Sequence, residues 1–193
     1  MGSARIDLTN QFLIAMPGMA DDNFVGAVVY LCEHTDQGAL GLVINKPTDI
    51  KLRNLFDKVE LPLERGDLAE QPVYFGGPVQ TERGFVLHER LGAGTDSPYH
   101  STLEIPGGLE MTTSKDVLEA MSAGAGPKRV LVTLGYSGWG AGQLEDEIGR
   151  NGWLTVQADP QVIFDTPIER RYECAVRLLG IDPQMLSQDA GHA

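Results

Sequence analysis

The chain has 193 residues, enough for one domain with a sizeable core, and its apolar (42%) and charged (22%) fractions are those of an ordinary globular protein. Its net charge of −12 excludes a general attraction to DNA, RNA or an anionic membrane. No apolar run approaches the roughly 20 residues that span a bilayer, and no secretory signal pattern is visible. We therefore expect a cytoplasmic protein of one domain, residues 1–193, with no membrane partner and no direct nucleic-acid binding.

Short strands and helices are predicted to alternate along the first half of the chain. Leu52, Leu55, Phe56 and Val59 recur at helical spacing, which predicts a helix over Lys51–Val59. Runs rich in β-branched and apolar residues, bounded by Gly, Pro and Asp, indicate strands. The predicted strands are Val25–Cys32, Ala39–Asn45, Val73–Phe75, Gly84–Glu89 and Ser101–Ile105. Residues 60–72 and 91–100 are predicted loops.

The second half of the chain has clearer helix signals. Thr113–Ser122 and Gln143–Arg150 are predicted helices, and the last helix is predicted to begin at Thr166, with Pro167 in its first turn, and to end at Gly180. Further strands are predicted at Arg129–Leu134, Trp153–Gln157 and Val162–Asp165. The last helix has an apolar face made of Ile168, Tyr172, Ala175, Val176 and Leu179. Interspersed strands and helices of this kind predict a mixed α+β fold.

A glycine-rich stretch, Gly135–Gly142, lies between a predicted strand and a predicted helix, with Tyr136 and Trp139 inside it. Such a turn is able to hold a phosphate. However, it has no lysine at the Walker position, and Gln143 stands where a dinucleotide-binding loop needs glycine. The stretch is therefore interpreted as a tight corner over which the two aromatic side chains pack. Ser137 does not form a nucleophile elbow, because the required final glycine is replaced by Trp139.

Cys32-Glu33-His34 closes the first long predicted strand. Alternation along a strand would put Cys32 and His34 on one face, and an imidazole beside a thiol favours the thiolate. His88 is a second candidate base. The competing interpretation is an inert, buried cysteine. Because nothing indicates an oxidising compartment, Cys32 and Cys174 are both expected to be reduced.

A second glycine corner, Gly76-Gly77-Pro78, is followed by Arg83 and His88. Arg83 and His88 are candidates to meet an anionic ligand, and the alternative is a solvated charge and a hydrogen-bonded strand histidine. The histidines and cysteines have none of the spacings typical of zinc sites, so we expect no metal and no cofactor.

Many separate motifs, in the same order, resemble the AlgH/YqgE family of bacterial proteins. They are Asn10–Pro17, Cys32-Glu33-His34, Gly41–Asn45 with Pro47, Gly76–Val79, Arg83–His88, Thr113–Asp116, Gly135-Tyr136 through Gly142–Glu145, Trp153-Leu154 and Gly191-His192-Ala193. The resemblance implies a single-domain cytosolic α+β protein of several short coiled sheets, partly barrel-like, flanked by helices. Ser137, often alanine in relatives, and Tyr172, where tryptophan is common, are small departures.

The resemblance implies no particular reaction, and one branch of the family has a name tied to the regulation of exopolysaccharide synthesis. The sequence therefore leaves two hypotheses. The first is a non-enzymatic regulatory protein that binds a small ligand or a protein partner. Its candidate binding residues are Gly76, Gly77, Arg83, His88, Tyr136, Trp139 and Gln143. The second is an enzyme or redox sensor centred on Cys32, with His34 or His88 as its base.

Overall fold

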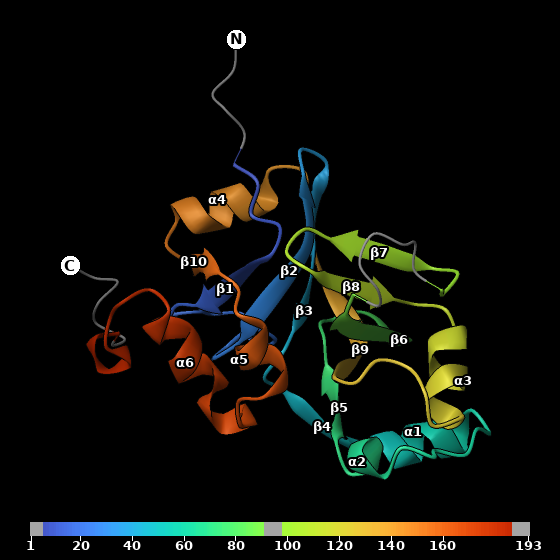
Figure 1. Ribbon diagram of the computed structural model, residues 1–193. Coiled ribbons are helices and arrows are strands. Elements are labelled where there is room, and N and C mark those ends of the chain that lie inside the picture. The colour runs from blue at the N-terminus through green and yellow to red at the C-terminus, as the bar shows by residue number, and fades with distance from the viewer. Residues whose placement is uncertain (1–5, 91–97, 187–193) are drawn as a thin grey trace.

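The structure is a computed structural model that describes residues 6–90 and 98–186. It is an α+β protein, as predicted, with one strongly curled and mostly antiparallel sheet (Figure 1). The strands within the described residues are β1 (Gln11–Ala15), β2 (Val28–Thr35), β3 (Gly38–Val43), β4 (Pro47–Lys51), β5 (Pro72–Phe75), β6 (Val79–Glu89), β7 (Thr102–Ile105), β8 (Leu109–Thr112), β9 (Val130–Gly140) and β10 (Trp153–Gln157). The α-helices there are α1 (Leu52–Lys58), α2 (Gly66–Ala69), α3 (Asp116–Ser122), α4 (Gln143–Gly149), α5 (Pro160–Phe164) and α6 (Arg171–Arg177), with 3₁₀ turns η1 (Ile168–Arg170) and η2 (Pro183–Met185).

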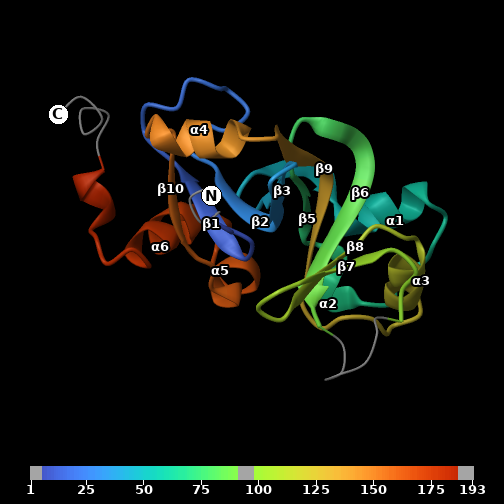
Figure 2. The same cartoon turned by 90° about the horizontal axis from the view of Figure 1, so that it is seen from above.

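The strands are ordered β10-β1-β2-β3-β9-β6-β8-β7, and β5 joins β9 in parallel and carries β4 on its other side. Seen from above, long β6 bends around the sheet (Figure 2), which agrees with the barrel-like curl expected from the family resemblance. Residues far apart in the chain become neighbours: β1 pairs with β10 along five residues, from Gln11 opposite Gln157 to Ala15 opposite Trp153. None of the described helices is long and apolar enough to cross a membrane.

Strand β9 belongs to both halves of the sheet. Its first part, up to Tyr136, pairs with β6, and the part from Ser137 to Gly140 pairs with β3. Gly135 lies where the pairing of β9 with β6 is irregular, between Leu134 and Tyr136, and has a φ of 79°, a conformation that glycine adopts without steric cost. The predicted strand ended at Leu134 and the glycines were interpreted as a corner. Most of them instead lie within β9, and the turn into α4 is made at Gly142.

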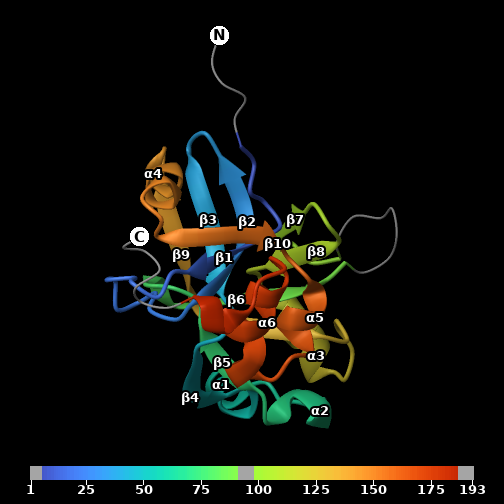
Figure 3. The ribbon, with the colours of Figure 1, turned by 90° about the vertical axis from the view of Figure 1, so that its left-hand side faces the viewer.

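Helices cover the sheet in three groups, and each group closes a separate part of the core. Helices α5 and α6 pack on one side (Figure 3), where Val162, Ile163, Ala175 and Val176 are buried. Helix α4 closes a second cluster, and α1, α2 and α3 close a third. The predicted apolar face of the last helix is confirmed, since all five of its residues pack in the first cluster.

Several predicted elements differ in type or extent. Residues 162–165, predicted as a strand, lie mostly in α5, because the side chain of Asp159 accepts a hydrogen bond from the Gln161 N–H and Pro160 starts the helix. The last helix begins as the 3₁₀ turn η1, and Thr166 does not cap it. Strands β1, β4 and β8 and helix α2 were not predicted. Of the predicted loop 91–100, residues 91–97 lie outside the described part.

Candidate functional site

The two glycine corners lie against each other. A Cβ built on Gly76 would be 2.3 Å from the carbonyl oxygen of Gly135, and one on Gly77 would be 2.2 Å from that of Tyr136. The hydroxyl of Ser137 donates to the Gly76 carbonyl at 3.0 Å. Gly76 and Gly77 are both buried. Their small size therefore serves close backbone packing, and the structure leaves no space for a ligand between them.

His88 is fully buried and hydrogen bonded on both ring nitrogens. Nδ1 lies 2.9 Å from the Glu89 carbonyl oxygen and Nε2 lies 2.8 Å from the Thr112 hydroxyl. A carbonyl only accepts, so Nδ1 carries the proton and Nε2 accepts from Thr112. Burial lowers the pKa of His88. This geometry is that of a neutral histidine held inside the sheet, without open space for a ligand.

Cys32 and His34 do not share a face. A β-bulge between Leu31 and Glu33 interrupts the alternation of β2. Cys32 packs in the first core cluster at 1% exposure, and burial, followed by the nearby charge of Glu33, raises the pKa of its thiol. Nδ1 of His34 instead accepts the Leu8 N–H at 3.0 Å. The expected thiol–imidazole pair is therefore not formed.

Arg83 is exposed on β6, with its guanidinium 5.7 Å from the ring centre of Phe85. The Tyr136 ring packs on the same phenylalanine edge-on, at 5.5 Å between ring centres. Phe85 thus connects two of the predicted binding residues, Arg83 and Tyr136. His88, Gly76 and Gly77 are buried and form no open face beside Arg83, Phe85 and Tyr136.

An aromatic cleft lies where the loop after β1 meets α4 and the ends of β9 and β10. Its floor consists of Phe24, Trp139 and Trp153. Phe24 stacks on Trp139, with 6.1 Å between ring centres, and meets Trp153 edge-on at 5.4 Å. The cleft has a volume of about 230 Å³. Its remaining lining comes from Met19, Asp21, Gly138, Gln143, Glu147, Arg150 and Gly152.

Glu147 fixes the floor of this cleft. One of its carboxylate oxygens accepts both indole N–H groups, from Trp139 at 3.1 Å and from Trp153 at 2.9 Å. The other oxygen accepts from the side-chain amide of Gln143 at 2.9 Å. Gln143 in turn accepts the Gly140 N–H at 3.0 Å, which ties α4 to the end of β9. Hydrogen bonds to a charged acceptor are stronger than neutral ones, so Glu147 holds the two indole rings firmly in place.

A second, shallow depression of about 410 Å³ adjoins the cleft, since both are lined by Gly138 and Trp139. Tyr136 and Leu40 form part of its surface, and Glu33 lies at its edge. Three of the predicted binding residues, Tyr136, Trp139 and Gln143, are therefore brought together, while Gly76, Gly77 and His88 are buried elsewhere. Within residues 6–90 and 98–186, no three His, Cys, Asp or Glu side chains gather as a metal site requires.

Comparison with known proteins identifies the family of the chain. The family model described as AlgH-like matches residues 12–184. The chain belongs to the AlgH-like family. A UPF0301 protein of Ralstonia nicotianae is 69% identical over 190 residues, 98% of this chain and 97% of the relative. A UPF0301 protein of Polaromonas is 69% identical over 191 residues, 99% and 98% of the two chains.

Two solved structures resemble this AlgH-like chain over most of their length. The solution structure of the AlgH protein from Pseudomonas aeruginosa is 48% identical, covers 100% of both chains and superposes with a TM-score of 0.77. A crystal structure from Corynebacterium diphtheriae is 19% identical, covers 92% of this chain and 89% of its own, and gives a TM-score of 0.69. The second shows likeness of fold alone.

Sequence reasoning on this AlgH-like chain missed Phe24, Glu147 and Trp153 as parts of the cleft. The spacing of Gln143 and Glu147, four residues apart on a predicted helix, was a visible sign that their side chains meet. The pairing of β1 with β10, which brings Trp153 beside Trp139, had no local signal. Phe24 lies in an irregular loop, where the periodicity of the sequence does not predict which way a side chain points.

Proposed function

We propose that this protein is a non-enzymatic regulatory protein of the cytoplasm that binds a protein partner through the aromatic cleft. The observation that carries the proposal is the arrangement of Phe24, Trp139 and Trp153 around Glu147. Rigid aromatic side chains cost little conformational entropy on binding, and hot spots of protein interfaces are enriched in them.

The size of the cleft favours a side chain of a partner over a free small ligand. Ligand pockets usually have about 300–1,000 Å³, whereas the cleft has about 230 Å³. That volume suits a single anchoring side chain, and the adjoining open depression offers a surface for the residues beside the anchor. Binding energy in protein interfaces concentrates in such central pockets, with near-neutral contacts around them.

Charge around the cleft indicates the chemistry of the partner segment. Asp21 and Glu147 line the cleft and Glu33 lines the depression. Arg150, which also lines the cleft, pairs with Asp146 at 3.2 Å. On a chain of net charge −12, we infer a partner segment with an apolar or aromatic anchor flanked by lysine or arginine.

An enzyme or redox sensor centred on Cys32 has less support. The thiol is 1% exposed, its pKa is raised, and neither His34 nor His88 is placed as its base. A reactive cysteine needs a lowered pKa and access to its reagent.

The test uses a photo-crosslinking amino acid at position 150, introduced into the protein in its source bacterium, with the same amino acid at exposed Glu104 as the control. A protein crosslinked at 150 and not at 104 is then purified, and its affinity is measured with Phe24→Ala and, as the matched control, Val25→Ala. Val25 is 49% exposed and does not line the cleft. We expect Phe24→Ala to bind at least tenfold more weakly and Val25→Ala to keep its full affinity. Equal affinities of the two variants would overturn the proposal.

A further inference from the structure

Arg171, the first residue of α6, is a buried cation. Arg171 is 5% exposed to solvent. Nε donates to the Thr166 carbonyl at 2.9 Å and Nη1 donates to the Ile44 carbonyl at 2.5 Å. The guanidinium carbon lies 5.2 Å from the ring centre of Tyr74. Burial raises the pKa of Tyr74, and the charge of Arg171 and its hydrogen bond act in the opposite direction.

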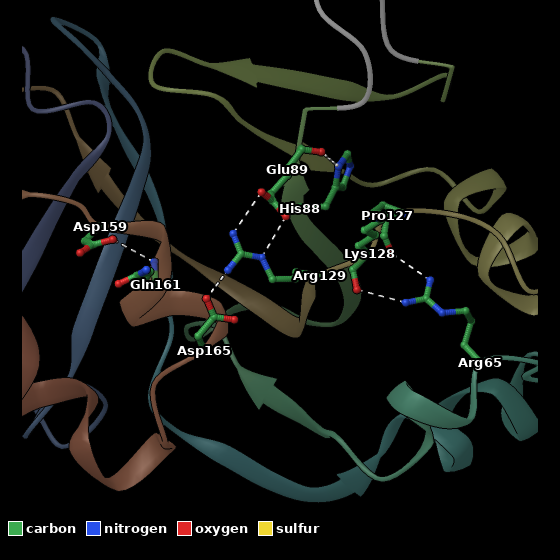
Figure 4. Close-up of polar contacts among 9 residues, drawn as sticks. All are labelled: Arg65, His88, Glu89, Pro127, Lys128, Arg129, Asp159, Gln161 and Asp165. Carbon is green, nitrogen blue, oxygen red and sulfur yellow. Dashed lines mark hydrogen bonds and ion pairs between the residues drawn. The ribbon is translucent and has the colours of Figure 1, made fainter.

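Among the described residues, no carboxylate lies within ion-pair distance of Arg171. The part-buried arginines elsewhere differ: Arg65 pairs with Asp67 at 2.8 Å, and Arg129 pairs with Glu89 at 2.9 Å and also with Asp165 (Figure 4). A buried charge without a counter-charge is costly, and arginine is rarely buried without a partner. Two of the five N–H donors of Arg171 donate to backbone carbonyls, and neither of these neutral acceptors balances the charge of the guanidinium.

Arg171 lines a cleft of about 340 Å³ between α5, η1 and α6 on one side and β5 and β9 on the other. Apolar side chains, among them Pro72, Leu131 and Phe164, form much of its wall, and Tyr74 lines it beside Arg171. The volume falls within the usual range of small-molecule pockets. This cleft shares no residue with the aromatic cleft.

We propose that this cleft binds a small organic carboxylate, whose charged group pairs with Arg171 while its apolar body lies against the wall. An arginine fork matches a carboxylate in geometry. The ligand supplies the counter-charge that the chain itself does not place beside Arg171.

Negative charges at the rim of the cleft favour a monoanionic ligand over a phosphate dianion. Asp165 and Glu169 both line the cleft. Asp165 is occupied by Arg129 (Figure 4), whereas Glu169 is exposed and forms no ion pair within the described residues. An unpaired acid at the rim repels a dianion more than a monoanion, so a carboxylate is favoured over a phosphate of the same body.

The experiment titrates the protein with benzoate, phenyl phosphate and benzamide at low salt, followed by amide chemical shifts in NMR. We expect benzoate to bind most tightly, with shifts at residues 71–74 and 163–171, and benzamide to bind at least tenfold more weakly. The emission of Trp139 and Trp153 should not change, which separates this site from the aromatic cleft. Equal binding of benzoate and benzamide, or benzoate shifts elsewhere, would contradict the proposal.

Three variants test the role of Arg171. Arg171→Gln should abolish benzoate binding, and Arg177→Gln, on the exposed side of the same helix, should leave it unchanged. Because Arg171→Gln also removes contacts that hold α6, Glu169→Gln provides a test in a protein that keeps those contacts. Removing the rim charge should tighten benzoate binding about two- to threefold at low salt and less at high salt. An unchanged or weaker affinity in Glu169→Gln would count against the proposal.

Discussion

At the scale of single residues, Glu147 shows how one side chain positions several others. One carboxylate oxygen holds two indole rings that come from different strands, and the other holds Gln143 on its own helix. Glu145, two residues earlier, has a different contact: its carboxylate lies 3.4 Å from Nε2 of the buried His34 ring. The contacts that surround each carboxylate, and not the residue type alone, therefore decide what it does.

Glu147→Gln should destabilise the protein by about 2 kcal/mol, because a neutral amide replaces a charged acceptor and presents an N–H₂ group close to two N–H donors. The measurement is urea unfolding followed by tryptophan emission. The control is Asp146→Asn, the neighbouring acid, whose side chain forms an exposed ion pair with Arg150. Its effect should stay below about 0.5 kcal/mol. Equal losses in the two variants would show that the indole hydrogen bonds add little.

Cys174 should react with alkylating reagents faster than Cys32. Cys174 is partly exposed on α6, whereas Cys32 is buried with a raised pKa. From the Cys-Glu-His motif alone, Cys32 is expected to be the more reactive thiol, and the structure predicts the opposite order. The fast reaction should disappear in Cys174→Ser and persist in Cys32→Ser at every pH from 6 to 9. If Cys32→Ser is the variant that loses it, β2 must open in solution and expose its thiol.

At the scale of elements, the predictions succeeded where the signal was local. Gln143–Arg150 and Trp153–Gln157 were predicted within a residue of α4 and β10, because apolar spacing and flanking glycines mark them. In α5, by contrast, the β-branched Val162 and Ile163 suggested a strand, and the helix start signal of Asp159-Pro160 was overlooked. Strand β9 was cut short because glycine usually ends a strand. Here, a Cβ on Gly135 would lie 2.4 Å from the carbonyl oxygen of Gly77, so the strand requires glycine at that position.

Helix α6 should depend on its buried face for stability. Val176 is fully buried in the first core cluster, so Val176→Asp should cost several kcal/mol, about 4, by burying an unpaired charge. Leu178→Asp is the control on the same helix end, since Leu178 is 38% exposed. The melting temperature should fall steeply for the first and little for the second. A similar melting temperature for both would mean that α6 detaches readily from the sheet.

At the scale of the whole molecule, the sheet runs through β3 and β9 without a break, and Arg129 adds ion pairs from β9's flank to Glu89 and Asp165. We propose that residues 1–193 form one domain on this ground. The candidate site was only partly predictable at this scale. Trp139 and Gln143 were found from the sequence, but Phe24 and Trp153 reach them through pairings between β1, β2 and β10 that join distant parts of the chain.

One domain should unfold in one transition. The chain has two tryptophans, which contact each other in the half of the sheet that contains β10, β1, β2 and β3. Their emission reports on that half, while circular dichroism reports on the whole. The two signals should give the same urea midpoint. Separate midpoints would mean that the two halves of the sheet unfold independently and would divide the chain into two domains.

The surface charge predicts no binding to random duplex DNA. The two basic pairs of the sequence, Lys128-Arg129 and Arg170-Arg171, do not form a basic patch, because Arg129 is ion-paired with acids and Arg171 is buried. Titration at about 50 mM salt, where phosphate contacts are strongest, should give no complex at micromolar protein. A complex that weakens steeply as salt is added would show a basic surface that the described residues do not reveal.

The pairing of β1 with β10 also has a consequence for synthesis on the ribosome. Strand β1 leaves the ribosome early, but the strand that completes its pairing begins 138 residues later, counting from Ala15 to Trp153. At about 5–20 residues per second, one edge of β1 waits about 7–28 seconds for its neighbour. During that time an apolar strand of Phe, Leu and Ile stands open to other nascent chains. Chaperones that shield nascent chains should therefore matter more for the yield of this protein than its final stability suggests.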